Sequence, residues 1–441
     1  MSIKYFRDPI HGYIEVSPHI LKIIDSPYFQ RLRRIKQLSF THLVYHGAEH
    51  TRFGHSLGVY HLARKLSNSI LKDEQEEIKE EFCLAALLHD IGHHPFSHSF
   101  ESVLKKNLED SGIDFDHANY TKELIKNTAI GDYIHGCGLS KDHIVQMIEG
   151  SFTEIPHLSY LNSLISSELD LDRLDYLLRD SYYCGIPYGN IDLDRLLISL
   201  KPVEGEIIVS ERGKPSTEMY VLARFYMYTQ VYLHHTTRAF DLMLQRVLSR
   251  DVLKELDYPK PEKDDIERLV DFDDLWLYGR IKEISKSTDS KGQIAEKIIK
   301  RDPIRCVIEK IAFVDAHSRA TDPEFSIVKS ISSSIDVIAK EAGVGEEEIF
   351  VDEPWKDLPL ENRYRPYTLS EAQDEIKPIK VESKGKIMDI AEDTSSIAYY
   401  VAKYMAQIIR IYTPLECRDK LATAIRDRYE ELHHLIWTKD S

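Results

Sequence analysis

The sequence predicts a mainly α-helical protein with a few short strands and a smaller mixed α/β region toward its C-terminus. Three observations lead to this fold class. Apolar residues recur at three- and four-residue spacing over much of the first 256 residues, which is typical of amphipathic helices. Strand-like runs are few and short. The chain has 441 residues, more than one hydrophobic core usually serves, so we expect a large domain with a smaller one attached.

The helices expected in the first half follow one another closely. Residues 17–38 predict two short helices that separate at Ser26 and Pro27, with Ser26 capping the second helix and Pro27 at its first position. Amphipathic spacing predicts further helices over residues 55–73, 76–92 and 162–183. Residues 216–256 show the same spacing over a length that fits either one long helix or two kinked helices.

Strands and region boundaries follow from local composition. Strand-like runs occur at residues 204–214, 361–369 and 376–383. The chain becomes strongly charged near residue 257. We therefore expect three regions, namely a core at 1–250, a helical extension at 251–345 and a mixed α/β region at 346–441.

Composition argues against several classes of function. The net charge of −16 repels nucleic acid, so a nucleic-acid partner is disfavoured. No apolar run reaches the roughly 18 residues of a membrane span, and the N-terminus lacks the apolar segment of a signal peptide. The five cysteines are scattered without a CxxC pair, which fits a reducing compartment. We expect a cytoplasmic protein without a membrane partner, in which any metal is held by His, Asp and Glu.

The stretch AALLHDIGHHPFSHSF, residues 85–100, places four histidines within ten positions behind an apolar helix. Imidazoles are costly to bury unless they are hydrogen-bonded or bind a ligand. Taken alone, the stretch fits a hydrogen-bonded patch of the core as well as it fits an active site.

Residues from three predicted helices can complete a metal site. His89 and Asp90 are adjacent, so both reach one ion only at a helix end or beside a cleft. With His55 and Asp172 they offer two imidazoles and two carboxylates. This donor set suits one divalent cation (Mn, Fe, Zn, Ni or Mg) and leaves positions open for water and substrate. Each of these residues taken singly is more often a core residue.

Five motifs resemble, in order, the HD-domain deoxynucleoside triphosphate triphosphohydrolases: DPIHGYIEV, IIDSPYFQRLRRIKQL, GAEHTRFGHSLG, HDIGHHPFSHSFE and DRLDYLLRDSYYCGI. The resemblance is strong from residue 4 to about residue 250 and weak beyond. It implies an HD-domain helical core and cleavage at the α-phosphorus, which releases the nucleoside and inorganic triphosphate. It implies a metal on His55, His89, Asp90 and Asp172, with further Mg on the nucleotide phosphates. The exact substrate does not follow, because fold and function are separable.

The resemblance also implies roles around the metal. The catalytic residues it implies are Arg52, His93, His98, Glu101 and His117, with His98 oriented by Glu101 as the general acid. The substrate contacts it implies are Gln37, Leu38, Arg52, Arg173, Tyr176, Asp180 and His234. His94 has no counterpart and is expected to be structural. A family tyrosine near the sugar C2′ is not evident, since Arg238 or Phe240 lies there, so selection against ribose is not predicted.

Regulation is implied in the same way. Lys4, Asp25, Gln30 and Arg33 match positions that hold an activating guanine nucleotide, and Arg212 and Lys214 match contacts to the phosphates of a second nucleotide. The family often forms nucleotide-dependent oligomers, so we expect a dimer or tetramer with GTP or a dNTP as activator. The alternatives are an HD phosphohydrolase acting on nucleoside monophosphates or other phosphoesters, and a nucleotide-sensing scaffold.

Overall fold

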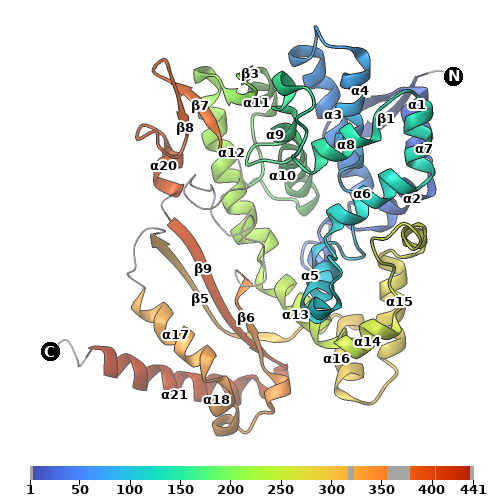
Figure 1. Cartoon of the computed structure of the whole chain (residues 1–441). Helices are drawn as coiled ribbons and strands as arrows, with labels where there is room; N and C mark the ends of the chain where they lie inside the picture. The colour runs from blue at the N-terminus through green and yellow to red at the C-terminus, as the bar shows by residue number, and fades with distance from the viewer. Residues whose placement is uncertain (1–2, 316–321, 355–377, 403, 438–441) are drawn as a thin grey trace.

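Helices dominate the protein, as the sequence predicts. The structure is a computed structural model that describes residues 3–315, 322–354, 378–402 and 404–437 (Figure 1). The strands in these residues form sheets of two, four and three strands, all small beside the helical part. The mainly α fold class is therefore confirmed.

The chain begins with a hairpin and two short helices. An antiparallel pair, β1 (Lys4–Asp8) and β2 (Gly12–Val16), precedes α1 (Pro18–Ile24) and α2 (Pro27–Arg31). The predicted break is confirmed, because the Ser26 hydroxyl accepts the Phe29 N–H at 3.3 Å and Pro27 begins α2. The hairpin was not predicted.

Three helices form the frame of the large core. Helix α3 (Arg52–Ile70) packs against α4 (Glu76–Leu88) and against α10 (Leu171–Cys184). The predicted helix at 162–183 is in fact two helices, α9 (Leu161–Ile165) and α10, because Asp170 caps a new helix by accepting the Arg173 N–H at 2.7 Å. The chain between α4 and α9 forms α5 (His98–Asn107), α6 (His117–Asn127), α7 (Ala129–Gly136) and α8 (Lys141–Ile148).

The predicted long helix at 216–256 is interrupted. Helix α12 (Lys214–Met227) runs into a π-helical segment at Tyr228–Tyr232, and α13 (His235–Val247) and α14 (Arg250–Glu255) follow. Before α12, the chain forms α11 (Leu193–Ser199), β3 (Leu200–Val203) and β4 (Glu206–Val209). The strand predicted at 204–214 is therefore confirmed only over β4, since a 3₁₀ turn follows it at Glu211–Gly213.

The remaining chain combines helices with the largest antiparallel sheet. Its helices are α15 (Asp274–Ile284), α16 (Ser290–Ile299), α17 (Pro323–Ser333), α18 (Ile335–Ala342), α20 (Ile397–Ala402) and α21 (Arg418–Trp437). Its strands are β5 (Arg305–Asp315), β6 (Phe350–Asp352), β7 (Lys380–Ser383), β8 (Lys386–Asp389) and β9 (Tyr404–Thr413). The candidate strand at 376–383 contains β7, and the candidate at 361–369 lies outside the described residues.

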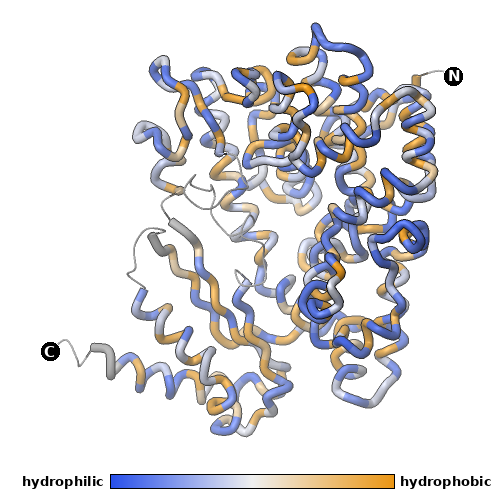
Figure 2. Tube along the Cα trace, viewed as in Figure 1, coloured by the Kyte–Doolittle hydropathy of each residue, from blue (hydrophilic) through white to orange (hydrophobic). Residues whose placement is uncertain are grey.

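Strand β9 pairs with both β5 and β6, and α17, α18 and α21 lie beside this sheet (Figure 1). Figure 2 shows apolar residues along β5 and β9 and mainly polar residues on α21. Ile331, Ile411 and Leu421 join in a separate small core beneath the helices. The long strand β5 was not expected in the helical extension, and the three region boundaries stay predictions.

One large apolar core extends from the N-terminal hairpin through α16 and takes in parts of β6, β7, α20 and β9, and it supports the residues considered below. Across the described parts of the chain, no helix has both the length and the apolar character needed to cross a membrane.

Gly58 allows α3 and α10 to lie close together, which gives a stability prediction. A methyl group at Gly58 would lie 1.9 Å from Asp175 Oδ1 and 2.5 Å from Arg179 Nη2. We expect Gly58→Ala to lower the free energy of unfolding by about 1–3 kcal/mol through overpacking, measured by urea denaturation. Gly54→Ala, one turn earlier, is the matched control, because its methyl would lie at an ordinary 3.5 Å from Arg179 Nη1. Equal stability of the two variants would contradict the close packing.

Candidate active site

Three helices bring the four predicted metal ligands together. His55 lies on α3, His89 and Asp90 follow the last residue of α4, and Asp172 lies in the first turn of α10. Ligand atoms of His55, His89 and Asp172 all lie within 4.8 Å of one another. Asp90 completes the group, with Oδ1 3.4 Å from His89 Nε2 and Oδ2 3.7 Å from His55 Nε2.

Hydrogen bonds fix which ring nitrogen of each histidine faces this group. His89 Nδ1 lies 2.9 Å from the Ala86 carbonyl, and His55 Nδ1 lies 2.8 Å from Asp175 Oδ2. In both rings the Nδ1–H donates to oxygen, which leaves Nε2 with its lone pair for a cation. Asp175 is one turn beyond Asp172 on α10, so a single helix supplies a carboxylate to each side of the His55 ring.

The surroundings of His55 Nε2 and His89 Nε2 show whether these residues fit a metal ion. Both are buried, and neither has a hydrogen-bond partner among the described residues. His55 Nε2 lies 2.9 Å from Asp172 Oδ1 without the alignment of a hydrogen bond. Buried unpaired nitrogens that converge with carboxylate oxygens fit a divalent cation. The donor set leaves the choice among Mn, Fe, Zn, Ni and Mg open.

The electrostatics of the group favour positive charge. Burial lowers the pKa of His55, but the carboxylates of Asp172 and Asp175 outweigh burial and raise it to about 10. Burial raises the pKa of Asp90, but Arg52 and the nearby imidazoles hold it well below its usual range. The carboxylates are therefore ionised at neutral pH, and a bound divalent cation would take the place of the proton that they hold on His55.

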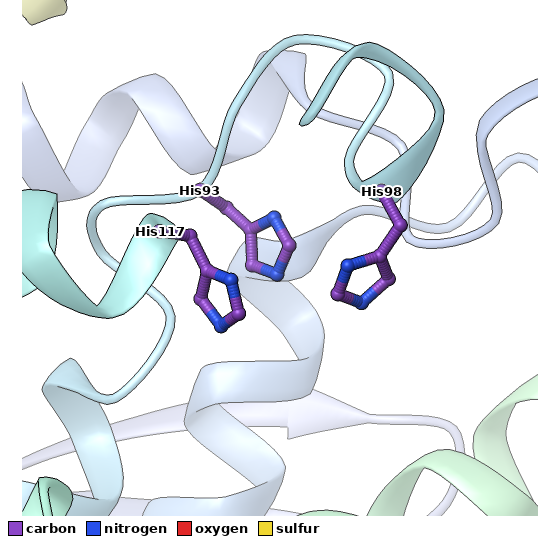
Figure 3. Close-up of side chains that lie close together, drawn as sticks. All are labelled: His93, His98 and His117. Atoms are coloured by element: carbon purple, nitrogen blue, oxygen red, sulfur yellow. The ribbon is translucent and has the colours of Figure 1, made fainter. Parts of the chain in front are cut away.

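A second cluster consists of three imidazoles, those of His93, His98 and His117 (Figure 3). The ring of His93 lies between those of His98 and His117, stacked on His117 at 4.2 Å and edge-on to His98 at 4.8 Å. His93 Nε2 is also 3.7 Å from Asp90 Oδ1, so the two clusters adjoin. The side chain of His98 is 61% exposed, which places it at the open side of the cluster.

Glu101 orients two of the three rings. Its Oε2 lies 2.9 Å from His98 Nδ1, and its Oε1 lies 3.2 Å from His117 Nδ1. Lys105 Nζ lies 2.9 Å from Glu101 Oε1 and 2.8 Å from Asp116 Oδ2, so an ammonium group occupies the acidic side of this cluster. With each Nδ1–H donating to Glu101, the Nε2 atoms of His98 and His117 are the ones available to a ligand.

The rings of His93 and His117 carry different charges at neutral pH. Burial, reinforced by Arg52, lowers the pKa of His93 well below its usual value. Burial also lowers the pKa of His117, but Glu101 outweighs this and raises it to about 9. A neutral imidazole thus stacks on an imidazolium, an arrangement that can hold an anion and exchange a proton.

The charge of His117 depends on Glu101, which can be measured directly. We expect Glu101→Gln to lower the pKa of His117 from about 9 toward or below its ordinary value, because burial is then no longer opposed by the carboxylate. The pair stabilises the fold fully below about pH 6.5, and this contribution is lost as the pH rises through about 9. Imidazole NMR titration measures the change. His143, whose pKa is raised by Glu81 and Glu154, is the internal reference. An unchanged His117 titration would contradict the role of Glu101.

Asp180 and Tyr176 lie on α10 in a polar and aromatic group. Asp180 Oδ1 lies 2.7 Å from His50 Nε2, and Oδ2 accepts the Tyr232 hydroxyl at 2.8 Å. Tyr232, in the π-helical segment, is also edge-on to Tyr176 at 6.1 Å. The sequence around Arg238 shows no evident tyrosine for this part of the site. In the structure, Tyr232 contacts both Asp180 and Tyr176. His50 stacks on Tyr183 at 4.6 Å.

Arg52 lies with the metal group as predicted, because its guanidinium bonds to Asp90 and its Nε donates to Ser97 Oγ at 2.8 Å. Gln37 is buried, and its Oε1 has no hydrogen-bond partner in the described part of the chain. Leu38, the next residue, is half-buried against the core. Arg173 instead bonds back to Asp170 and to the Ser167 carbonyl.

His234 and Arg238 lie beyond the π-helical segment. His234 caps α13 by accepting the Thr236 N–H at 3.2 Å and stacks on His235. Arg238 bonds to Asp352 on β6 at 2.8 Å, which ties α13 to the C-terminal sheet. Phe240 is buried and stacks on Phe40. His94 has both nitrogens engaged, with Tyr258 and the Phe115 carbonyl, which agrees with a structural role.

The residues predicted to bind regulatory nucleotides lie in two places. Asp25 directly follows α1 as its C-cap and is exposed. Arg33 donates to Gln30 Oε1 at 2.8 Å, and its guanidinium lies 3.5 Å from the centre of the Phe53 ring. Lys4 is exposed on β1. Arg212 is exposed in a turn, whereas the Lys214 ammonium pairs with Asp393 and donates to Ser395 Oγ at 2.8 Å.

Sequence reasoning missed residues that hold the site in place. Asp175, His50 and Tyr232 each bond to a predicted site residue. Asp175 had one usable signal, since it is the third acidic residue in LDLDRLD, one helical turn after the predicted ligand Asp172. His50 and Tyr232 lack a local signal, because their partner Asp180 is distant in sequence.

Known proteins support this picture. Residues 52–180 match the family described as "HD domain", and residues 191–430 match "HD associated region". The uncharacterized protein YwfO of Bacillus subtilis is 40% identical over 56% of this chain, and the match spans only 55% of YwfO. The "deoxynucleoside triphosphate triphosphohydrolase SAMHD1 homolog" of Dictyostelium discoideum is 31% identical over 79% of this chain and 67% of its own. The crystal structure of a hypothetical protein from Aquifex aeolicus, 29% identical, superposes with a TM-score of 0.74 over 96% of this chain and 100% of that one.

Proposed function

The chain belongs to the family of proteins that join an HD domain to an HD-associated region, and on that premise we propose that it is a metal-dependent deoxynucleoside triphosphate triphosphohydrolase. It would cleave the substrate at the α-phosphorus and release the nucleoside and inorganic triphosphate. The observation that carries the proposal is the contact between two groups. A set of metal ligands adjoins a Glu-oriented imidazole cluster, with His93 Nε2 3.7 Å from Asp90 Oδ1. The Dictyostelium relative named for this activity supports it.

The residues that adjoin the metal group suit a triphosphate ester. A divalent cation on His55, His89, Asp90 and Asp172 supplies polarisation of a phosphate oxygen and an acidified water when bound. Arg52 and the His117 imidazolium hold the negative charge of the phosphates, since both are cationic at neutral pH. His93 is neutral and accepts a hydrogen bond or proton at the same place.

His98 is the proposed general acid. Its Nδ1 is held by Glu101 Oε2 at 2.9 Å, which orients the ring and makes Nε2 the atom that would pass a proton to the leaving 5′ oxygen. Its exposed side chain allows it to reach a bound substrate. Glu101 is the positioning partner of His98, in the way that a carboxylate orients histidine in other hydrolases.

The polar and aromatic group on α10 is the proposed sugar site. Asp180, already bonded to His50 and Tyr232, accepts a hydrogen bond from the sugar 3′ hydroxyl, and Tyr176 packs on the sugar ring. Gln37 contributes its unpaired buried carbonyl oxygen. A group of buried polar atoms that fits one sugar strongly disfavours an analogue that leaves them unpaired.

The product of hydrolysis tests the proposal. The purified protein is incubated with each dNTP and NTP in Mn²⁺ or Mg²⁺, with and without GTP, and the released phosphate is identified. Inorganic triphosphate with free nucleoside is the expected result. Release of monophosphate or pyrophosphate contradicts the proposal and favours another phosphoesterase of the HD superfamily. Absence of turnover under every condition contradicts it as well.

We also propose that a guanine nucleotide activates the enzyme and promotes its assembly into a dimer or tetramer. Asp25 is the proposed reader of guanine, because its two carboxylate oxygens can accept the N1–H and N2–H of the base. Gln30 and Arg33 adjoin it on α2 and the following turn. An activator that promotes assembly must bind the assembled form more tightly. Sedimentation velocity with and without GTP tests this, and equal mass in both states contradicts it.

A further inference from the structure

A single buried carboxylate of the HD-associated region joins two segments of the candidate active site. Asp274 is the first residue of α15 and is 6% exposed. Its Oδ2 accepts the Lys36 N–H at 2.9 Å, and its Oδ1 accepts the Phe96 N–H at 2.7 Å. Lys36 directly precedes Gln37, and Phe96 lies two residues before His98. Each oxygen therefore holds the backbone of a different wall of the site.

The Phe96 end of this bridge is a strained turn. Phe96 and Ser97 have φ angles of 50° and 51°, in the left-handed region that side chains other than glycine rarely adopt. Such a conformation persists only where the surroundings hold it, and it occurs preferentially at functional sites. The Ser97 hydroxyl donates to the Lys36 carbonyl at 2.9 Å and accepts from Arg52 Nε at 2.8 Å. The turn that carries His98 is thus tied to the Lys36 segment twice.

Helix capping does not account for Asp274. The neighbouring Asp273 is the N-cap of α15, where its Oδ1 accepts the Trp276 N–H at 3.0 Å. Asp274 has both oxygens turned to Lys36 and Phe96 instead. Two backbone donors that belong to the site, and not to its own helix, offset part of the cost of burying this carboxylate.

Two further contacts hold the same loop, one from Arg31 on α2 and one from Tyr258 of the HD-associated region. Arg31 is buried and donates to the His93 carbonyl from Nη2 and to the Phe272 carbonyl from Nε, each at 2.7 Å. Tyr258 bonds to His94 at 2.8 Å. The segment from Tyr258 to Asp274 therefore contacts the loop directly at His94 and Phe96, and Arg31 links Phe272 of this segment to the His93 carbonyl.

We propose that Asp274 is a positioning residue, which sets the place of the His98 and His93 rings relative to the metal ligands and to the Gln37 wall. This inference rests on the proposed function. It gives the HD-associated region a part in the catalytic loop in addition to Tyr232 beside Asp180, although none of the predicted metal ligands and none of the His93, His98 and His117 rings belongs to that region. Because Asp274 acts on the loop and not on the ligands, metal binding does not depend on it.

Asp274→Asn is the main test. Asparagine keeps one acceptor but presents an amide N–H to the other backbone donor, so one of the two ties is lost. We expect kcat to fall about tenfold, and about a hundredfold in Asp274→Ala, as for small misplacements of reacting groups. KM and metal content are expected to stay within twofold of wild type. Hydrogen exchange, followed by mass spectrometry without substrate, is expected to quicken at residues 92–100.

Asp273→Asn is the matched control, since asparagine is an equally good N-cap and only the pair with Arg34 is lost. It is expected to keep wild-type kcat and wild-type exchange at residues 92–100. Should Asp274→Ala fail to fold, Asp274→Asn alone decides. A wild-type kcat in Asp274→Asn overturns the inference, and so does loss of its metal. If the wild-type protein hydrolyses no dNTP, the proposed function fails, and unchanged exchange at residues 92–100 in Asp274→Asn then separately overturns the inference.

Discussion

Replacing Asp172 with alanine is expected to lower dNTP hydrolysis by on the order of 10³-fold, equivalent to ~4 kcal/mol of barrier, and to remove most of the bound metal. Asp172 Oδ1 lies 2.9 Å from His55 Nε2 and 3.7 Å from His89 Nε2, so it faces both imidazole ligands at once. Its loss leaves two neutral nitrogens and Asp90, and the latter is already engaged by Arg52. Metal content by plasma mass spectrometry and turnover by triphosphate release measure the two effects.

The matched control for Asp172→Ala is Asp194→Ala. Asp194 is likewise an acidic residue in the first turn of a helix, but it is exposed and pairs with Lys65. It is expected to keep both metal and turnover, because an exposed ion pair contributes little. Full metal content in Asp172→Ala would remove Asp172 from the ligand set, whatever its activity.

Replacing Asp175 with asparagine is expected to destabilise the protein by about 3–5 kcal/mol and to weaken metal binding by about 10–100-fold. Its carboxylate contacts His55 at 2.8 Å, His11 at 2.6 Å and Arg179 at 2.8 Å, with every partner buried. The change removes one of the two carboxylates that pair with Arg179, and it removes the carboxylate that orients the His55 ring. Urea denaturation measures the first effect, and metal titration of the apoprotein measures the second.

Asp8→Asn separates the two consequences of the Asp175 change. Asp8 also pairs with Arg179, with Nη1 2.8 Å from its Oδ2, but it does not contact His55. It is expected to lower stability while metal affinity stays at the wild-type value. If Asp8→Asn weakens metal binding as much as Asp175→Asn, then the orientation of His55 by Asp175 is not what matters.

The acid limit of stability should also change in Asp175→Asn. Burial raises the pKa of Asp175, but Arg179 and the bonded histidines outweigh burial and hold it well below its usual range. A depressed pKa contributes stability that is complete above about pH 4 and is lost as the pH falls toward the folded value. The variant lacks this contribution, so its stability is expected to fall less steeply below pH 4 than that of the wild type.

The metal ligands could be predicted because each lies within a short motif. His89 and Asp90 stand together at a helix end, and Asp172 lies in the dense LDLDRLD pattern. Their convergence in space agrees with the resemblance that those motifs carry. Asp274 could not be found in this way, because it acts on Lys36 and Phe96, which are far from it in the sequence.

Errors in the fold prediction have a similar cause. The spacing of apolar residues in 216–256 is helical throughout, but the structure has a π-helical segment within this range, at Tyr228–Tyr232. Strands β5 and β9 contain the apolar, β-branched-rich runs CVIEKIAFV and QIIRIY, yet their status as strands depends on pairing with each other across about a hundred residues. Local periodicity thus predicted the apolar segments better than it predicted where a helix is interrupted or which segments pair as strands.

The π-helical segment at Tyr228–Tyr232 has a consequence for how the chain tolerates changes of length. Each residue advances a helix by about 100°, so a single deletion in this segment would rotate all of α13 relative to α12. Arg238 would then turn away from Asp352. Asp241 would turn away from Ser99, whose hydroxyl now donates a hydrogen bond to Asp241 Oδ1 at 2.7 Å. Substitutions at exposed positions of this segment are therefore tolerable, whereas insertions and deletions are not. The segment sets the rotation of α13 and the C-terminal sheet relative to Tyr176 and Asp180, which contact Tyr232 at its end.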